Sequence, residues 1–354
     1  MKAGDLIVEK GGRTFVDVAA VLPDWLEGGR RIEKIETGES RIEVRVMKRA
    51  GRGGSNSKGF ILSRFLELDE FFFENLGLWE GEGGKHKGLY YGNISIEALL
   101  HFIKFSEDRI GVSRMQFNVT LNVPKIRGSE EETKREWSKK LSIPYENFTN
   151  ICIDERINEE YAQLYVNGII MSELMNNLHS KLMPCILERQ EFAAAYLRGF
   201  IAAEAAVVLK EWGTVAHVSV ANRNMDVIVF VTECLSRLGI SRGKYFESSG
   251  SFPICGKLNF DIARKHGLMR LNLKKNQKFE DGMNKFQRTV FPGGKMESMI
   301  LELLKSGPKT YDDIAVSLSK GRSTIQSHYV PILESKSLIR KSGKKGRAWM
   351  FEAV

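Results

Sequence analysis

The sequence contains two similar stretches, LGLWEGEG at residues 76–83 and LRGFIAAEA at residues 197–205. Each is an apolar run with small residues at helical spacing, and each carries an acid near its end, Glu82 or Glu204. Small residues along one stripe let two helix backbones approach closely, whereas a carboxylate at the end of such a pair needs a cation nearby. The two stretches therefore predict a pair of tightly packed helices that both end in an acid.

The same order of features follows each stretch, which indicates an internal repeat. In the first copy Asn93 precedes a helix that closes with RIGVSR at 109–114. In the second copy Asn222 precedes a helix that closes with RLGISR at 237–242. A duplication inside one chain predicts pseudo-twofold symmetry, with the two equivalent helices meeting at the axis and their terminal acids beside it.

Periodicity and cap residues outline the elements of the first copy. Asp69 is a candidate N-cap of the first helix, and Pro184 is expected to lie in a linker before a second helix begins at Arg189. The other predicted elements are helices at 95–109, 130–140 and 169–178 and strands at 116–123 and 162–166.

The two copies resemble the LAGLIDADG homing endonuclease family in its single-chain, two-repeat form. The resemblance covers roughly residues 65–290 and implies two αββαββα repeats whose sheets form a saddle over the DNA major groove. It also implies that the last acid of each motif is catalytic and binds a divalent metal ion near a scissile phosphate. By position these acids are Glu82 and Glu204, which would hold Mg²⁺ or another divalent cation that activates water.

The second motif departs from the family pattern at two positions. The earlier acid, Glu80 in the first motif, is replaced by Ala202 in the second, and the final glycine, Gly83, is replaced by Ala205. The family also contains members that kept the saddle and lost the chemistry. Any catalytic asymmetry between the two halves should therefore originate in the second motif.

Residues 291–354 resemble a winged helix-turn-helix domain. Three helical patterns precede two predicted strands around the basic stretch KSGKKGR at 341–347. In such domains the third helix enters the major groove and the hairpin wing lies along the phosphates, although some winged domains bind protein instead. By this resemblance the candidate DNA-binding residues are Arg322, Ser323, Thr324, Gln326 and Ser327 on the helix, and Lys341, Lys344, Lys345 and Arg347 on the wing.

Composition and charge are compatible with a DNA partner. The 354 residues carry a formal net charge of +9, which attracts phosphate polyanions at long range. No apolar run reaches the roughly 20 residues that span a bilayer, so a cytoplasmic protein without membrane contact is expected. The glycine-rich residues 51–54 lack the ending of a P-loop, and no nucleotide cofactor is expected. The internal repeat predicts a monomer, and the four cysteines are expected to be buried free thiols.

The chain as a whole is expected to be α+β. Short alternating runs before residue 47 predict strands, and the basic loop at 48–58 is either a solvated hairpin tip or a backbone contact to DNA. The expected parts are a β-rich N-terminal domain at 1–64, a first repeat at 65–183, a second repeat at 184–290 and the winged helix-turn-helix domain at 291–354.

Several lysines have two interpretations each. Lys85 and Lys210 follow the two acids and could stabilise a phosphate during cleavage. Lys274, Lys275 and Lys278 follow the last strand pattern and could meet phosphate, although a solvated helix face explains them equally well.

Two functions remain from the sequence. The leading hypothesis is a site-specific, metal-dependent endonuclease that cleaves the phosphodiester bonds of double-stranded DNA, because both terminal glutamates survive. The alternative is a catalytically inactive DNA-binding transcriptional regulator, which Ala205 and the winged domain favour.

Overall fold

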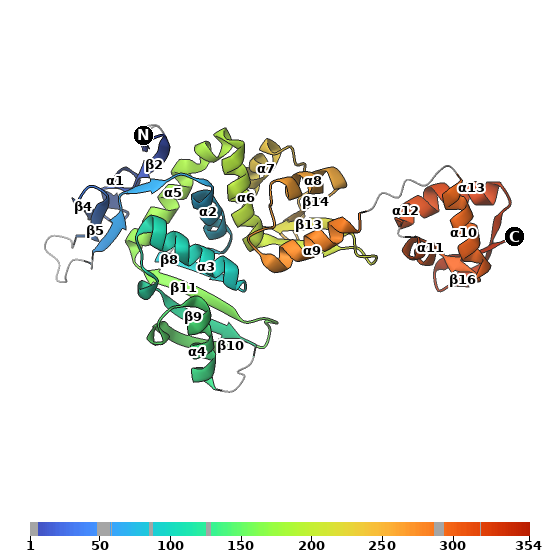
Figure 1. Ribbon diagram of the computed structural model, residues 1–354, viewed down its shortest axis with the longest axis horizontal. Coiled ribbons are helices and arrows are strands. Elements are labelled where there is room, and N and C mark those ends of the chain that lie inside the picture. The colour runs from blue at the N-terminus through green and yellow to red at the C-terminus, as the bar shows by residue number, and fades with distance from the viewer. Residues whose placement is uncertain are drawn as a thin grey trace. The chain divides into compact units, whose positions relative to one another are not determined.

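The computed structural model of the chain describes residues 6–47, 57, 59–84, 88–124, 129–286, 294–318 and 320–354 (Figure 1). The chain divides into two compact units, Met1–Val208 with His217–Phe279, and Leu209–Ala216 with Glu280–Val354. The basic loop at 48–58 lies outside the described residues, except for Ser57. Lys85 and the domain boundary expected at residue 290 also lie outside them. Within the described ranges, no helix combines the length and apolar character needed to cross a membrane.

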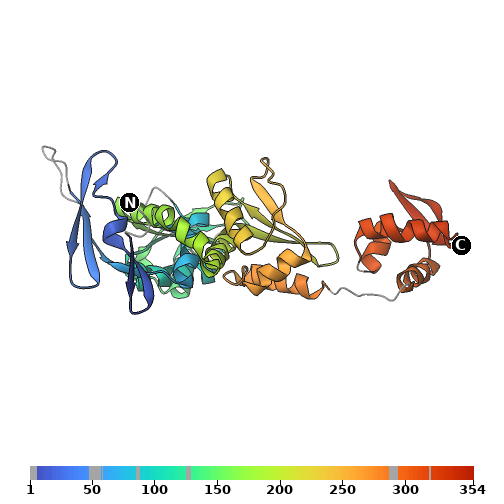
Figure 2. The same ribbon diagram turned by 90° about the horizontal axis from the view of Figure 1, so that it is seen from above.

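The N-terminal part consists of short antiparallel strands, drawn in blue in Figure 2. Three of them match the alternating runs in the sequence, and four more carry weaker patterns because they are short or charged. Two sheets form, with orders β1-β2-β7 and β3-β4-β5-β6. The strand β7 pairs with β2, so the first of these sheets extends past the boundary expected at residue 64. The elements are β1 (Ile7–Lys10), β2 (Arg13–Asp17), α1 (Val18–Val21), β3 (Trp25–Leu26), β4 (Arg30–Glu36), β5 (Arg41–Val46), β6 (Phe60–Ser63) and β7 (Phe65–Glu67).

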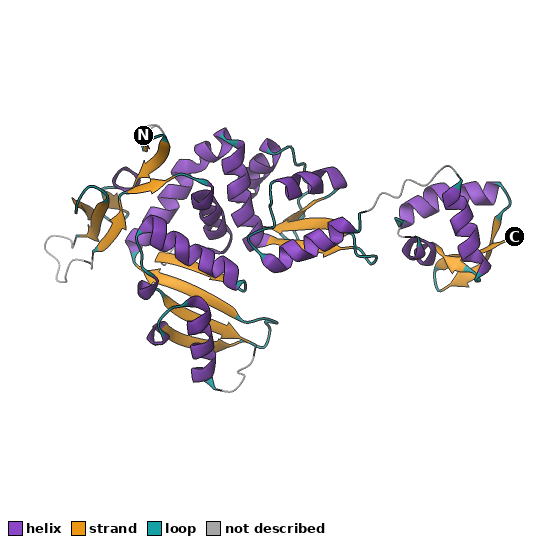
Figure 3. Ribbon diagram, viewed as in Figure 1, coloured by secondary structure: helices purple, strands orange, loops and turns teal. Residues whose placement is uncertain are grey.

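The first repeat alternates helices and strands (Figure 3). Its first helix begins after Asp69, whose carboxylate accepts a hydrogen bond from the Phe72 amide at 2.8 Å, as the predicted N-cap requires. Its four-stranded sheet has the order β10-β9-β11-β8, and β10 runs parallel to β9. The elements are α2 (Glu70–Glu82), β8 (Gly88–Asn93), α3 (Ile96–Phe105), β9 (Asn118–Val123), α4 (Glu130–Leu141), β10 (Phe148–Ile153), β11 (Tyr161–Asn167) and α5 (Ile169–Glu188).

The expectation that Pro184 marks a linker is wrong. Pro184 lies inside α5, which continues to Glu188, and only Arg189 separates this helix from the next one. A proline removes one backbone donor, yet the buried side chains of Leu182, Cys185 and Ile186 hold the last turns of α5 in the core.

The second repeat has the order α6 (Gln190–Glu204), β12 (Ala205–Leu209), β13 (Val215–Ala221), α7 (Met225–Arg237), β14 (Ser251–Ile254), α8 (Lys257–Lys265) and α9 (Leu273–Asn284). Its sheet contains three strands in the order β12-β13-β14 among the residues described. Before β14, the stretch around Gly243 and Gly250 forms only an isolated bridge between Phe246 and Ser251. A stretch rich in glycine and serine pays a high entropic cost to form a strand.

The described residues of neither repeat show the full αββαββα order. The first repeat has one named strand between its first two helices and contains the additional charged helix α4, and the second repeat lacks a full fourth strand among its described residues. The two repeats still share the opening helix, the sheet and the helix that follows Asn93 or Asn222.

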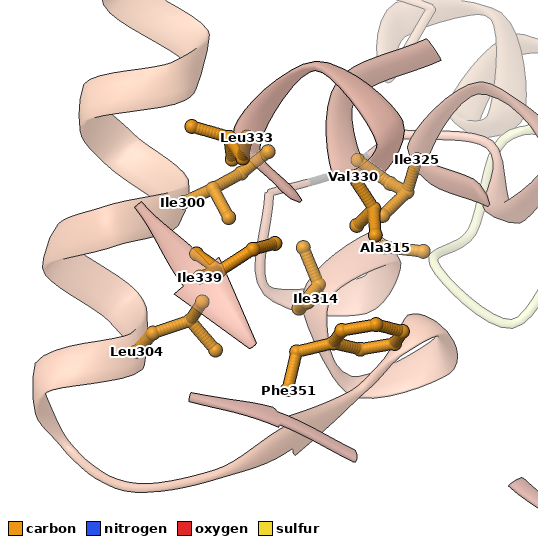
Figure 4. Packing of buried hydrophobic residues seen from close by; sticks show 9 residues of the cluster. All are labelled: Ile300, Leu304, Ile314, Ala315, Ile325, Val330, Leu333, Ile339 and Phe351. Carbon is orange, nitrogen blue, oxygen red and sulfur yellow. The ribbon is translucent and has the colours of Figure 1, made fainter. Parts of the chain in front are cut away.

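The described residues from 294 to 354, called the C-terminal unit below, contain three helical segments and a three-stranded antiparallel sheet of order β15-β17-β16. Its core is formed by buried aliphatic side chains and Phe351 (Figure 4). The third helical segment has a π-helical turn at Ile325–Tyr329, just before Pro331, which lacks an amide donor. The elements are α10 (Lys295–Lys305), β15 (Lys309–Thr310), α11 (Tyr311–Ser317), α12 (Arg322–Thr324), α13 (Val330–Ser335), β16 (Ile339–Lys345) and β17 (Ala348–Ala353).

The cysteines are free thiols, as expected, but only two of them are buried. Cys185 and Cys234 lie in the core, whereas Cys152 and Cys255 are exposed.

Candidate functional site

The helices α2 and α6 pack through two glycines that make reciprocal contacts. A Cβ atom at Gly77 would overlap the Tyr196 carbonyl oxygen and lie 2.9 Å from the Phe200 amide nitrogen. A Cβ atom at Gly199 would overlap the Glu74 carbonyl oxygen and lie 2.6 Å from the Leu78 amide nitrogen. The two sets of contacts are related by the same offset of 122 residues, which takes 77 to 199, 74 to 196 and 78 to 200. The two helices therefore meet about a pseudo-twofold axis.

The same packing brings the acid-bearing ends of the two helices together. A Cβ atom at Gly81 would lie 2.5 Å from the Ala203 Cβ and 3.0 Å from the Glu204 Cγ. Burial raises the pKa of Glu204 to about 7, and the nearby negative charge of Glu82 contributes to that rise. Burial also raises the pKa of Glu82. Glu82 and Glu204 are thus partly buried neighbours that repel each other when both are ionised.

A lysine of α9 supplies positive charge at this place. The Lys275 ammonium donates hydrogen bonds to the carbonyl oxygens of Ile201, Ala202 and Ala203, at 3.3, 2.6 and 3.2 Å. These carbonyls belong to the last turn of α6, where the supply of helical amides runs out, and the Ile201 carbonyl also accepts a hydrogen bond from the Ala205 amide that caps the helix. The charge of Lys275 opposes the rise in the pKa of both Glu82 and Glu204. Burial lowers the pKa of Lys275 itself to about 8.

The surroundings of the two acids differ. Asn222 donates a hydrogen bond to Glu204 Oε1 at 3.2 Å, and its own side-chain oxygen accepts from the Asn224 amide. The corresponding Asn93 accepts from the Ser95 amide in the same manner, but it donates to the Tyr91 hydroxyl at 3.2 Å. Both asparagines served as sequence landmarks only, and nothing local in the sequence distinguishes the one that contacts an acid.

Glu80, the earlier acid of the first motif, is 3% exposed. Its Oε2 lies 3.3 Å from His179 Nε2 of α5. The same histidine nitrogen lies 3.2 Å from the Tyr196 hydroxyl. The second repeat has Ala202 at the position of Glu80. It therefore lacks the acid that contacts His179 in the first repeat.

A buried ionic cluster joins the N-terminal half of α2 to the middle of α6. Arg198 Nε of α6 donates to Glu74 Oε1 of α2 at 2.6 Å, and these two residues are 4% and 3% exposed. Arg198 also contacts Glu70, and Arg270 contacts Glu74. Burial alone would raise the pKa of Glu74, but His101, Arg198 and Arg270 lower it to about 2.

The residues at the paired acids do not fit a divalent metal ion as they stand. Two carboxylates and several carbonyl oxygens are the donors that Mg²⁺ or Ca²⁺ prefers. The ammonium of Lys275, however, already binds the carbonyls and neutralises charge beside both acids. Among the residues that the structure describes, no group of three or more His, Cys, Asp or Glu side chains could hold a metal ion.

The candidate DNA-binding residues of the C-terminal unit are all exposed. Ile325 and Val330 are buried and hold the opposite side of the helical segment in the core. Arg322 Nε lies 3.4 Å from Asp312 Oδ1. The exposed set consists of Arg322, Ser323, Thr324, Gln326 and Ser327 on the helical segment, and Lys341, Lys344, Lys345 and Arg347 on the β16–β17 hairpin.

Trp349 belongs to the same hairpin but was not among the residues selected from the sequence. Its side chain is 41% exposed, and the Nζ atoms of Lys344 and Lys341 lie 4.4 and 5.3 Å from its ring centroid. The alternation of β17 would not have indicated this position, because it places Trp349 on the same face of the strand as the buried Phe351.

The strand register places different side chains on the two repeat sheets. In the first sheet, Asn122, Thr120 and Asn118 of β9 lie opposite Tyr161, Gln163 and Tyr165 of β11, and all six are partly exposed. In the second sheet, Ser219 and Ala221 of β13 lie opposite Pro253 and Ser251 of β14. At these paired positions the first sheet carries long neutral polar side chains and the second carries short ones, although His217 of β13 lies on the same face as Ser219 and Ala221.

Comparison with known proteins agrees with the resemblance over part of the chain. Residues 191–252, which include Glu204 and all of α6 except Gln190, match the LAGLIDADG-like domain family. No curated protein matches the chain.

Several solved structures are similar to the chain at low sequence identity. Mesophilic variants of the homing endonuclease I-DmoI are 16% identical, with a TM-score of 0.31, over 57% of this chain and 98% of theirs. I-DmoI in complex with DNA and Mn is 13% identical, with a TM-score of 0.35, over 55% of this chain and 94% of that one. Full-length DUF199/WhiA from Thermatoga maritima is 11% identical, with a TM-score of 0.37, over 75% of this chain and 90% of that one.

Proposed function

We propose that the chain binds double-stranded DNA without cleaving it and acts as a transcriptional regulator. The observation that carries this proposal is the surface of the C-terminal unit. One helical segment and one hairpin expose all the residues that the resemblance to a winged helix-turn-helix domain selects as DNA-binding candidates. This is the alternative hypothesis of the sequence, now preferred to the nuclease.

The hairpin lysines and the helical residues would make different kinds of contact to DNA. Lys341, Lys344 and Lys345 are point charges suited to phosphate oxygens, which position a protein on DNA but do not read its sequence. Arg322 and Gln326 lie on the helical segment and have the donors and acceptors that recognise guanine and adenine in the major groove. The hairpin should therefore supply affinity, and the helical segment should supply specificity.

The first repeat supports a DNA partner independently. Asn and Gln side chains make paired hydrogen bonds to adenine, and Tyr and Thr side chains make single ones. The face formed by Asn118, Thr120, Asn122 and Gln163 offers such groups without a net charge. The short side chains of the second sheet offer few, so base contacts should be concentrated on the first repeat.

The paired acids give less support to the nuclease hypothesis. A metal-dependent cleavage reaction needs an ion held by carboxylates, with an open position for water or phosphate. At Glu82 and Glu204 the compensating charge is supplied by Lys275, whose ammonium is bound to the end of α6. The closeness of the two acids remains the observation that favours a nuclease, and a cleavage test decides between the two functions.

Removing positive charge from the hairpin should weaken DNA binding at every sequence. For Lys344→Ala, we expect the slope of log Kd against log salt to fall by about 0.9, because one phosphate contact releases one condensed counterion. Fluorescence anisotropy with a 30-base-pair duplex at several salt concentrations measures this slope. The matched control is Lys305→Ala, an exposed lysine of α10 paired with Glu302, and it should leave the slope unchanged. Equal slopes for wild type and Lys344→Ala would contradict the placement of DNA on the hairpin.

Incubation with a randomised duplex library should give binding but no cut products. We expect intact DNA whether Mg²⁺ or Mn²⁺ is present. Sequencing of the recovered DNA ends detects any cleavage. The contrary result is specific cuts by the wild type that are absent with both Glu82→Gln and Glu204→Gln. That result would contradict the non-cleaving proposal and support the nuclease hypothesis.

A further inference from the structure

The β16–β17 hairpin gathers two lysines and a tryptophan on one face. Residues that pair directly in an antiparallel sheet project their side chains to the same side. Trp349 pairs with Lys344, and Phe351, two residues further along the same face, pairs with Lys341. The Nζ atoms of Lys344 and Lys341 lie 4.4 and 5.3 Å from the centroid of the Trp349 ring. Two ammonium groups therefore meet at one exposed aromatic ring.

A β-bulge makes this arrangement possible. Lys341 and Lys344 are three residues apart, and in a regular strand residues at an odd separation point to opposite faces. The register shifts between Lys341 and Gly343, so that Ser342 is the extra residue of the bulge. Gly343 has a φ of +153°, which a residue with a Cβ atom rarely adopts. The bulge thus brings both lysines to the face of the tryptophan.

This face of the hairpin changes from core to surface along its length. Ile339 and Phe351 lie in the hydrophobic core of the C-terminal unit (Figure 4). Trp349 lies beyond them and is 41% exposed. The structure describes both strands along their whole length, and their one acid, Glu352, pairs with Arg340 on the opposite face. The exposed end of the face therefore combines an aromatic ring with positive charge.

A nucleotide has the complementary chemistry. Its flat base can stack on an aromatic ring, and the phosphates on either side of it attract ammonium groups. In an intact duplex each base is covered above and below by its neighbours, and only its edges are open in the grooves. The ring face of Trp349 can therefore stack only on a base that is unpaired or flipped out of the helix.

We propose that Trp349, with Lys341 and Lys344, forms a stacking site for an unpaired base, so that the chain prefers DNA with a bulged nucleotide to fully paired DNA. The inference rests on the proposed function and names the DNA structure that the hairpin would select. An exposed contact between an ammonium group and a ring is weak, so both lysines can turn from the ring to the phosphates. The site tolerates any sequence, because every base has a face that can stack.

The test compares the affinity of the full chain for two 30-base-pair duplexes. One duplex is fully paired, and the other carries a single extra 2-aminopurine nucleotide that bulges from its centre. We expect the wild type to bind the bulged duplex about tenfold more tightly in fluorescence anisotropy, which corresponds to about 1.4 kcal/mol and is typical of one base stacked on an aromatic side chain. Stacking should also quench the 2-aminopurine fluorescence.

Variants at the ring separate stacking from the packing of the hairpin. Trp349→Ala should lose both the preference and the quenching and keep its affinity for the paired duplex. Trp349→Leu keeps apolar bulk on the strand without an aromatic ring, so it should behave as Trp349→Ala. The matched control is Trp25→Ala, which removes an exposed tryptophan of β3 and should retain the preference. The thermal midpoint of each variant shows whether it is folded.

Three results would overturn the inference. The first is equal affinity of the wild type for the two duplexes. The second is a folded Trp349→Ala or Trp349→Leu protein that keeps the preference and the quenching. The third is an equal loss of affinity for both duplexes in these variants, because the ring would then contact paired DNA. If neither variant folds, the wild-type comparison still tests the inference.

The same measurements separate this inference from the proposed function. A wild type that binds both duplexes equally would remove only the inference. A wild type that binds the bulged duplex and not the paired one would support the stacking site and contradict the proposed binding of double-stranded DNA.

Discussion

Gly199→Ala is expected to lower the thermal midpoint of the repeat unit by roughly 6–12 °C. The added methyl group would overlap a backbone carbonyl of α2 and lie 2.6 Å from the Leu78 amide nitrogen, and neither atom can rotate away. The helices must separate to accommodate it. Overpacking of this kind costs about 3 kcal/mol, and for a unit of this size each kcal/mol corresponds to roughly 2–4 °C. Differential scanning calorimetry measures the midpoint.

The pseudo-twofold axis gives this prediction an internal check. Gly77→Ala makes the equivalent contact from the other helix and should have a similar effect. Gly321→Ala is the control, because a Cβ atom at Gly321 would have no neighbour closer than 3.7 Å. An unchanged midpoint in both Gly199→Ala and Gly77→Ala would show that the close approach of α2 and α6 is not required for the fold.

Arg198→Met should destabilise the protein by about 3 kcal/mol. The arginine is 4% exposed, and it donates to Glu74, which is 3% exposed. Removing the Arg198 guanidinium leaves the buried Glu74 carboxylate with less positive charge beside it. Breaking a buried ion pair in this way costs roughly 3–5 kcal/mol. Arg270 still contacts Glu74 in the variant, so the lower end of this range is expected. The measurement is the free energy of unfolding in urea.

The pH dependence of stability distinguishes a lost charge contact from lost packing. The pKa of Glu74 is about 2 in the folded protein and lies below its usual value of 4.5. The depressed pKa therefore contributes stability above pH 4.5, and this contribution is lost as the pH falls from about 4.5 to 2. In Arg198→Met this part of the dependence should flatten.

A surface arginine provides the control for this variant. Arg189→Ala removes an exposed residue whose pair with Glu191 should be worth less than about 1 kcal/mol. If Arg198→Met and Arg189→Ala have equal effects, the buried cluster does not stabilise the interface.

The packing of the two motif helices could be predicted from the sequence because it depends on local signals. Glycines at helical spacing, the Asp69 cap and the repeated order of features specify α2, α6 and their contact. The strands of the repeats were harder, since Gly243 and Gly250 reduce a predicted strand to an isolated bridge. Local rules place Pro184 in a linker because proline disfavours a helix interior, whereas tertiary packing retains it in α5.

The identity of the charges around the acids could not be read from the chain. In the sequence, Lys275 is one of three nearby lysines, with Lys274 and Lys278, that could each contact a phosphate. Nothing in the sequence distinguishes it from the other two. Its hydrogen bonds reach residues 72 to 74 positions earlier in the chain. Only the placement of α9 selects this lysine, and no periodicity encodes that placement.

The ionic cluster between α2 and α6 has a consequence for the origin of the chain. Arg198 stands at the position that Leu76 occupies in the first motif, and Tyr196 stands at that of Glu74. A dimer of two first halves would bury two acids without the Arg198 guanidinium. A dimer of two second halves would bury two guanidiniums without the Glu74 carboxylate. Each half therefore needs the other to neutralise its buried charge, and a homodimer of either half alone would require substitutions in this core.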